Sequence, residues 1–278
     1  MSLFLKSTLC IVIATQCSLG ADIFVDNTIG RDSYNGLIPT LGEAKAGPVR
    51  SLTRAAQLAQ QGDMINLANT GIPYYDSLSL TGERHSGTPN FPFVVNGNGA
   101  TLSGLRSIPS EGWQQQAKNL WKLTSTRKGY YQLLRDTELV PEFLISQPGD
   151  PLSSLPPGHW MSWRGSLYFR QDGHIPPTQQ SFAFSADQTG ISLHRVRNVV
   201  IANLKLQHFR FDGLHAQGLC RNIELDDVTS KENGRAGIVA SGGSNIELFG
   251  GKVERNGRHQ ILAIDRSTAI QKLAEATK

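Results

Sequence analysis

The stretch from Asn198 to Ser267 reads NVVIANLKLQHFRFDGLHAQGLCR, then NIELDDVTSKENGRAGIVASGGS, then NIELFGGKVERNGRHQILAIDRS. Laid in register, these are three versions of one segment. The leading asparagines Asn198, Asn222 and Asn245 are separated by 24 residues (198 to 222) and 23 residues (222 to 245). Self-similarity with a period in the twenties is typical of solenoids, in which each repeat forms one coil and stacks on the next. The stretch therefore predicts a repetitive, coiled fold.

Apolar residues recur in this repeat with a period of two, which indicates strands with one face in a core. One pair of columns lies near the start of the repeat, and a second pair lies near its end. A half-repeat upstream, GISLH at 190–194, matches the second pair. The columns are Val199/Ile223/Ile246, Ile201/Leu225/Leu248, Leu214/Ile238/Ile261 and Ala216/Ala240/Ala263. We predict an all-β parallel solenoid whose regular coils occupy residues 189–267.

The chain before the repeat predicts a short helix among several strands. RSLTRAAQLAQQGD at 50–63 spaces its apolar residues as a helix does, with Ser51 as the N-cap and Gly62 closing the end. Strands are expected at 21–26, 64–68, 77–82, 91–95 and 100–104. Since the first coil of a parallel solenoid exposes unpaired backbone groups, we expect the helix to cap it within residues 21–104.

Several short motifs in this part stand in a recognisable order: a Val-Asp-Asn turn, Gly-Pro before the helix, and Gly-Asp before the next strand. They comprise Val25, Asp26, Asn27, Gly47, Pro48, Leu52, Gly62, Asp63 and Ile65. This order resembles the amino-terminal end of secreted right-handed parallel β-helix proteins of the pectate-lyase-like superfamily. The resemblance implies a right-handed parallel β-helix and a function on polysaccharides. It also implies that the leading asparagines, and a second column of Asn233 and Asn256, form ladders of amides buried in turns.

Residues 105–188 lack the repeat and contain all four tryptophans, Trp113, Trp121, Trp160 and Trp163. Segments such as NLWKLTS and MSWRGSLYF predict antiparallel strands. We interpret the region as an inserted β-subdomain, and similar insertions occur in β-helix glycosidases that act on branched or modified sugars. The tryptophans form the core of this insert or, alternatively, a platform on which sugars stack.

The first twenty residues indicate a secreted protein. Residues 1–20 carry Lys6, an apolar run, and the small residues Ser18 and Gly20 before Ala21, which is typical of a cleaved signal peptide. The alternative is an uncleaved membrane anchor, but the run is broken by Gln16 and is shorter than a membrane span. We expect secretion to the periplasm or the extracellular space, and no membrane span after cleavage.

Composition and charge narrow the choice of partners. Removal of the signal peptide leaves Cys220 as the last cysteine, so no internal disulfide is expected. The formal charge of +4 suits an anionic partner. Nucleic acid is not expected, because the chain has no run of Lys and Arg. We therefore expect a monomer whose partner is an acidic polysaccharide, one that carries carboxylate or sulfate groups.

Outward positions of the repeat contain a column of Phe211, Arg235 and Arg258. Two adjacent guanidinium groups repel each other unless water, a carboxylate or a bound anion neutralises them. A uronate carboxylate or a sulfate would bridge them. Alternatively, the two arginines extend into water or pair with Glu232 and Glu254.

Three histidines near the same edge are either bases and donors to sugar hydroxyls or solvated surface residues. We take Asp212, His215 and His259 as candidate catalytic residues, and Arg235, Arg258 and His208 as candidate substrate-binding residues. All of these except His208 are expected to face outward. The strand edge that carries them is thus the predicted site.

Two local motifs resemble those of β-helix polygalacturonases: FDGLH at 211–215 resembles TDGxD, and GRH at 257–259 resembles GHG. An inverting glycosidase needs two carboxyl groups about 6.5 to 9.5 Å apart. The intervening coil carries Arg235 and Ala236 where such a partner for Asp212 would stand. A lyase would instead need a cation to neutralise the uronate and a base near its α-proton.

One adjacent acidic pair, Asp226 and Asp227, lies on a different strand and is either solvated or a Ca²⁺ site. No other cofactor or metal is assigned. The leading hypothesis is a secreted lyase or glycoside hydrolase of an acidic polysaccharide. The alternatives are a non-catalytic β-helix that binds glycans and a fragment of a longer enzyme, because few coils precede the tail at 268–278. That tail is expected to be a helical cap or the edge of a truncated chain.

Overall fold

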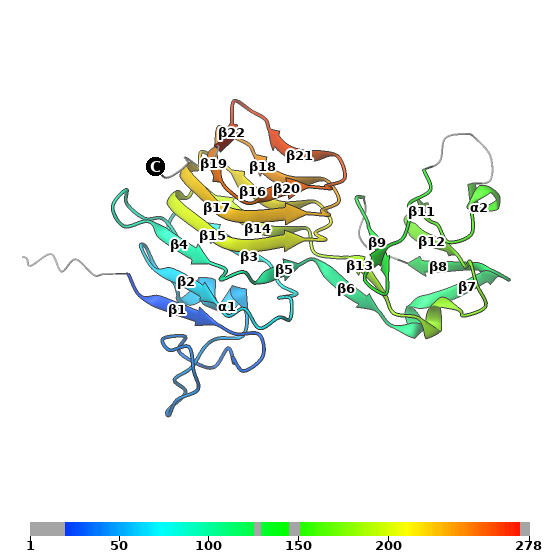
Figure 1. The fold of residues 1–278 in the computed structure, drawn as a ribbon, viewed down its shortest axis with the longest axis horizontal. Coiled ribbons are helices and arrows are strands. Elements are labelled where there is room, and N and C mark those ends of the chain that lie inside the picture. The colour runs from blue at the N-terminus through cyan, green and yellow to red at the C-terminus, as the bar shows by residue number, and fades with distance from the viewer. Residues whose placement is uncertain (1–19, 125–128, 145–150, 273–278) are drawn as a thin grey trace, which may run out of the picture.

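The protein is an all-β chain, seen in a computed structural model that describes residues 20–124, 129–144 and 151–272 (Figure 1). Helices in these residues are short and few: α1 (Leu52–Leu58), α2 (Pro151–Ser154), and two single 3-10 turns. The expected signal peptide at 1–20 lies outside the described residues except for Gly20, as does the end of the tail at 273–278. No helix of the described chain has the length and apolar character that a membrane crossing requires.

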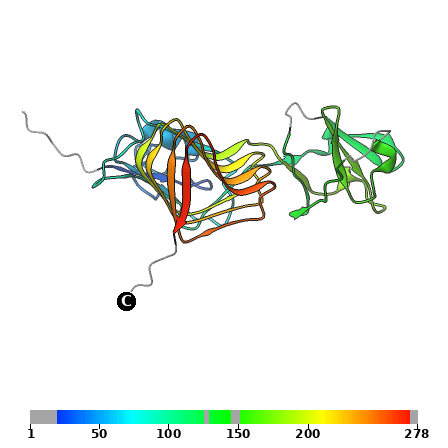
Figure 2. The same ribbon diagram turned by 90° about the horizontal axis from the view of Figure 1, so that it is seen from above.

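Two parallel sheets form the larger part of the molecule, and the chain alternates between them. Sheet A runs in the order β1 (Asp22–Val25), β2 (Met64–Leu67), β4 (Phe93–Asn96), β15 (Arg197–Gln207), β17 (Arg221–Lys231), β19 (Asn245–Phe249), β22 (Thr268–Lys272), with β5 (Thr101–Ser103) and β20 (Lys252–Glu254) at its side. Sheet B runs β3 (Leu78–Thr81), β14 (Thr189–His194), β16 (Asp212–Gln217), β18 (Ala236–Ala240), β21 (His259–Ala263). This alternation is consistent with a parallel β-helix, and Figure 2 shows the later strands stacked side by side.

The strand register confirms the apolar columns read from the sequence. In sheet B, Leu214 pairs with Ile238, and Ile238 pairs with Ile261. In sheet A, Ile223 stands between Val199 and Ile246. Most of these side chains are fully buried in one continuous core between the sheets. Period-two alternation thus places the apolar residues inside and leaves the intervening positions for contact with solvent or ligand.

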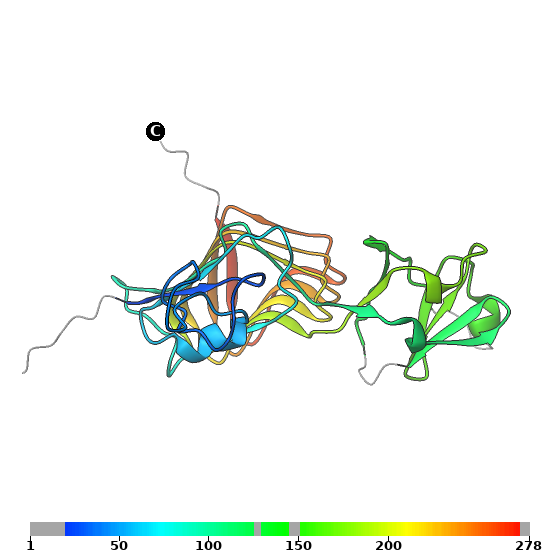
Figure 3. The same cartoon turned by 90° about the horizontal axis from the view of Figure 1, so that it is seen from below.

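The first coils carry α1, whose amino end is capped as predicted. The Ser51 side chain accepts a hydrogen bond from the Arg54 amide. Leu52 and Ala55 are buried in the main core, and Figure 3 shows the helix beside the first strands. The helix ends at Leu58, before the predicted end at Gly62. A function of α1 as a cap stays a prediction.

Residues 105–188 form two antiparallel sheets beside the parallel ones (Figure 1). The first contains β6 (Leu105–Ile108), β13 (Phe182–Ser185), β9 (Leu133–Arg135) and β10 (Glu138–Leu139), and the second contains β7 (Trp113–Ala117), β8 (Leu120–Thr124), β12 (Ser166–Arg170) and β11 (Trp160–Trp163). Trp113, Trp121 and Trp160 are buried in a core of their own, and Trp163 packs partly buried against a smaller cluster. The tryptophans therefore stabilise this region, and the alternative of a sugar platform is wrong for the three buried ones.

The expected helical cap at 268–278 is not formed by its described part. Thr268–Lys272 is strand β22, which pairs in parallel with β19. The apolar residues Ala269, Ile270, Leu273 and Ala274 have a spacing in the sequence that suits a helix, but the edge of sheet A offers backbone partners to Thr268–Lys272 that a helix would leave unpaired. The tertiary context therefore overrides the local pattern.

The two asparagine columns differ in environment. Asn233 is fully buried, and its side chain accepts from the Phe209 amide and donates to Asn256 Oδ1, at 3.0 and 2.9 Å. The leading column is not buried as expected: Asn222 is exposed, although its side chain donates to Asn198 Oδ1 at 2.8 Å. Asn222 also adopts a φ of 53°, a left-handed conformation that asparagine tolerates better than most residues.

Candidate functional site

The outward residues near the start of the sheet B strands meet the region 105–188. The ring of Tyr130 packs edge-on against Phe211, with 5.4 Å between centroids. The Arg258 guanidinium lies 5.2 Å from the centre of the Tyr130 ring, and the Arg235 guanidinium lies 5.4 Å from that of Phe211. The predicted arginine column therefore exists, but each of the two arginines lies against an aromatic ring.

Asp212 is not outward-facing as predicted. Its side chain is 1% exposed and accepts two hydrogen bonds from Arg235, from Nε to Oδ1 at 2.9 Å and from Nη2 to Oδ2 at 2.5 Å. The contact is possible because the two residues lie on consecutive coils, about 4.8 Å apart in the stacking direction. The charge of Arg235 is thus neutralised by Asp212, so Arg235 does not require a bound anion.

His215 lies three residues after Asp212 on β16, and its two nitrogens face two different groups. Nδ1 is 3.9 Å from Asp212 Oδ2, and Nε2 is 2.8 Å from Ser241 Oγ. The pKa of His215 is lowered, chiefly by burial. The negative charge of Asp212 opposes this decrease, and the positive charge of Arg235 adds to it. The imidazole is therefore neutral at neutral pH, which is the state that a general base requires.

Ser241 is a site residue that the sequence reasoning missed. Ser241 directly follows β18. His215 pairs with Val239 on the next coil, and Ser241 lies two residues after Val239. In the sequence, Ser241 stands at the outward position that follows the apolar column residue Ala240, and the two glycines Gly242 and Gly243 come next. A serine in a turn is common, so that signal alone carries no chemistry.

Arg258 remains the free cation of this cluster. In the described parts of the chain, no carboxylate lies within ion-pair distance of its guanidinium, which lies against the Tyr130 ring. Partial desolvation raises the pKa of the Glu142 carboxyl in the neighbouring antiparallel region, and the positive charge of Arg258 offsets part of that rise. Much of the Glu142 side chain is nevertheless open to solvent.

The other two predicted histidines do not join this cluster. His208 is buried in a turn, where Nε2 lies 3.5 Å from Glu232 Oε2, and burial lowers its pKa. Glu232 is also paired with Arg255 at 2.8 Å, so it does not neutralise Arg235 or Arg258. His259 is exposed at the start of β21. The structure therefore joins Asp212, His215 and Arg235, and leaves His208 and His259 apart from them.

Metal ligands do not gather in the described residues, which contain no group of three or more His, Cys, Asp or Glu side chains placed to hold an ion. Asp226 and Asp227 are both exposed on β17. Asp227 has a φ of 50°, so that the chain bends there. Ca²⁺ takes six to eight oxygen ligands, so these two side chains would need further ligands from backbone carbonyls or water.

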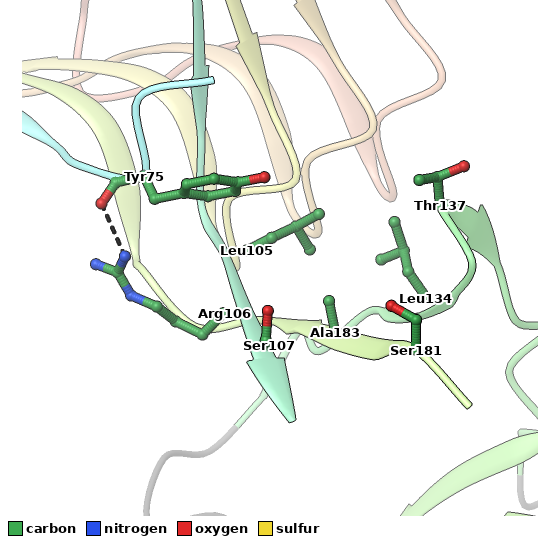
Figure 4. Close-up of a pocket in the computed structure, with 8 residues that line it drawn as sticks. All are labelled: Tyr75, Leu105, Arg106, Ser107, Leu134, Thr137, Ser181 and Ala183. Atoms are coloured by element: carbon green, nitrogen blue, oxygen red, sulfur yellow. Dashed lines mark hydrogen bonds between the residues drawn. The ribbon is translucent and has the colours of Figure 1, made fainter. Parts of the chain in front are cut away.

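At least two cavities in the described part of the chain lie away from the arginine column. The first, of about 350 Å³, opens where β6 and β13 leave the parallel sheets, and Figure 4 shows the Tyr75 ring above Leu105 with hydroxyls of Ser107 and Ser181 below. Arg106 is fixed there by the Tyr75 carbonyl and by Asp187, each within 2.8 Å. The second, of about 730 Å³, lies along the turns at 81–89 and 194–198.

Comparison with known proteins leaves this chain without an assigned family. No family model matches it, and no curated protein matches it. Among solved structures, one described as the complex of XylC with xylose aligns with 91% of this chain at 10% sequence identity and a TM-score of 0.46. This chain spans 65% of the length of that structure's chain. A similarity of this size carries no argument about function.

Proposed function

We propose that the protein is a secreted, monomeric carbohydrate-active β-helix protein that binds an acidic polysaccharide along the outer face of sheet B. In this proposal the parallel coils are right-handed, α1 caps their first turn, and residues 105–188 are an inserted subdomain that borders the binding site through Tyr130. The secretion signal expected at 1–20 supports the extracellular location, where such polymers occur.

The observation that carries the proposal is the free guanidinium of Arg258 beside the Tyr130 ring. An arginine can bind a carboxylate or sulfate with two parallel hydrogen bonds, and an aromatic ring nearby offers an apolar face to a pyranose. Arg235 next to it is already neutralised by Asp212. Among the described residues of this cluster, Arg258 therefore supplies one unpaired positive charge, which suits one acidic group of a bound polymer.

Elimination fits the geometry better than hydrolysis as the way to cleave such a chain. Hydrolysis needs two accessible carboxyl groups, whereas Asp212 is buried and bound to Arg235. Elimination needs a neutral base near the α-proton of the uronate, and the imidazole of His215 offers one, while Arg258, two coils away, would bind the acidic group of another sugar unit. The second hypothesis, binding without cleavage, follows from the hydrogen bond that already occupies His215 Nε2.

Binding is tested by calorimetry of the mature protein with a uronic-acid polysaccharide and with a neutral one. Replacing Arg258 by Ala should weaken binding of the acidic polymer at least about tenfold, because the charge-assisted hydrogen bonds of the guanidinium are lost, and leave the neutral polymer unaffected. Arg164→Ala is the matched control, because Arg164 is also exposed and lies 4.4 Å from the ring centre of Trp163. Equal weakening for both polymers, or by both variants, would contradict the proposal.

Cleavage is tested on the same polymers by two readouts, the ultraviolet absorbance of unsaturated products and the release of reducing ends. Absorbance together with reducing ends supports elimination. Reducing ends without absorbance would show hydrolysis and overturn the mechanism given above. Retained binding with neither signal would leave a binding protein, the second hypothesis.

A further inference from the structure

We propose that Ser241, His215 and Asp212 form a nucleophilic triad that hydrolyses carboxylic esters. This reaction differs from cleavage of the sugar chain, because it removes an acyl substituent from an alcohol. The triad itself does not depend on the proposed function, but the suggestion that the alcohol belongs to a polysaccharide rests on it.

The three side chains have the order that nucleophilic catalysis requires. Ser241 Oγ lies 2.8 Å from His215 Nε2, which is within hydrogen-bonding reach of a general base. On the other side of the ring, His215 Nδ1 lies 3.9 Å from Asp212 Oδ2. That gap is longer than a hydrogen bond, but contacts between catalytic groups are often loose before substrate binds.

The strands β16 and β18 position the triad residues, and Arg235 fixes the orientation of the Asp212 side chain. Asp212 and His215 lie on one strand, β16, and the parallel register of β18 places Ser241 on the next coil. Arg235 holds both carboxylate oxygens of Asp212, so that this buried side chain has one orientation. An acid that orients the ring favours the tautomer with the proton on Nδ1 and leaves Nε2 free to accept the serine proton.

The turn after Ser241 supplies candidates for binding the oxyanion. Gly242 and Gly243 both have left-handed backbone conformations, with φ of 59° and 73°. Within the described chain, the amide N–H of neither residue donates to a backbone carbonyl. Free backbone donors next to a nucleophile stabilise the charge that develops on the carbonyl oxygen, and the amide that follows the nucleophile serves this role in other hydrolases.

The proposed reaction has two steps, acylation of Ser241 and hydrolysis of the acyl-serine. Ser241 Oγ bonds to the ester carbonyl carbon as its proton passes to His215 Nε2, and the C–O bond to the alcohol breaks as the alcohol takes up that proton. Water then adds to the acyl-serine and gives a proton to His215. When the bond to Ser241 breaks, the serine regains a proton and the carboxylic acid leaves.

The low exposure of Ser241 favours a small acyl group. The residue is 8% exposed, so a short acyl group such as acetyl meets less obstruction than a bulky one. The free alcohol product stays at the surface, where Arg258 and Tyr130 would hold an acidic sugar chain. An acetylated acidic polysaccharide is therefore the substrate class that joins the two proposals.

The test uses the full mature protein and a fluorophosphonate probe, which modifies activated serines, with the labelled peptide identified by mass spectrometry. We expect the adduct on Ser241, its loss in Ser241→Ala, and much slower labelling in His215→Gln. Ser79→Ala should label normally, because Ser79 is an exposed serine on sheet B two coils away from His215. Thermal unfolding of each variant confirms that it is folded. Labelling elsewhere, or none at Ser241, would overturn the proposal.

Acetate release provides the second readout, measured from a small acetyl ester and from an acetylated acidic polysaccharide. Ser241→Ala should lose at least about a thousandfold in the rate on both substrates. Undiminished release by that variant would refute the triad. If Ser241 labels and cleaves the small ester but the polysaccharide neither binds nor loses acetate, then the proposed function fails while the triad stands. Normal binding of the polysaccharide without labelling of Ser241 would overturn the triad and leave the proposed function standing.

Discussion

The ion pair between Asp212 and Arg235 offers a prediction whose size follows from burial. Asp212 is 1% exposed, and the Arg235 side chain is 31% exposed. Replacing Arg235 by Ala leaves the carboxylate in the protein interior without its two donors. Breaking a buried ion pair costs about 3 to 5 kcal/mol. Because water can enter where Arg235 was partly exposed, we take the lower end, a loss of about 3 kcal/mol in the free energy of unfolding.

Replacing both residues should be less harmful than replacing Arg235 alone. The double variant, Asp212→Ala with Arg235→Ala, leaves no buried charge at this place. Its loss in the free energy of unfolding then comes only from reduced packing and from the missing hydrogen bonds. We expect the double variant to recover about 1 to 2 kcal/mol relative to Arg235→Ala, a coupling within the range found for residues in contact. Arg258→Ala is the control, since an exposed cation over an aromatic ring contributes only about 0.5 to 1 kcal/mol.

Urea unfolding followed by tryptophan fluorescence and circular dichroism measures these differences. The dependence of the free energy on urea must be the same for all variants, because a change in slope would mean that the exposed surface has changed. Additive losses within about 0.3 kcal/mol would show that Asp212 and Arg235 do not stabilise each other. That result would also remove the fixed carboxylate on which the triad depends.

Two other predictions concern buried polar groups. Asn233→Ala should destabilise the protein by about 1 to 3 kcal/mol in urea unfolding, because the buried Phe209 amide loses its acceptor, and a loss below about 0.5 kcal/mol would contradict the ladder. Stability should also fall on acidification: His85, His208 and His215 all have pKa values below the ordinary 6.5, so the unfolded chain binds protons first. The penalty is absent above about pH 6.5 and grows below it, and a melting temperature that is constant from about pH 7.5 to about 5 would refute this reasoning.

The parallel core could be predicted from the sequence because period-two alternation and a repeat of fixed length together determine strand register. Leu214 and Ile238 pair as the alignment of repeats requires. Burial of the same columns on consecutive inner coils makes a slip of one residue costly, since it would turn the whole apolar set to solvent. The all-β class and the parallel pairing therefore follow from the alternation together with the repeat.

The failed predictions at the site have a common physical reason, which is contact between residues at different positions of neighbouring coils. The alignment of repeats places Arg235 above Arg258, but it does not reveal that Arg235 contacts Asp212, which lies on the neighbouring coil at the adjacent repeat position. The same is true of Ser241, which meets His215 across one coil and two positions. Such contacts depend on how each turn bends, and the bend is determined by tertiary packing.

Binding of an acidic glycan at Arg258 is tested most directly by a crystal structure of the mature protein with a uronic-acid oligosaccharide. We expect a sugar carboxylate within hydrogen-bonding distance of the Arg258 guanidinium and a pyranose ring against Tyr130. An oligosaccharide bound instead in the cavity beneath Tyr75, or along the turns at 194–198, with Arg258 uncontacted, would show that the binding site has been wrongly placed.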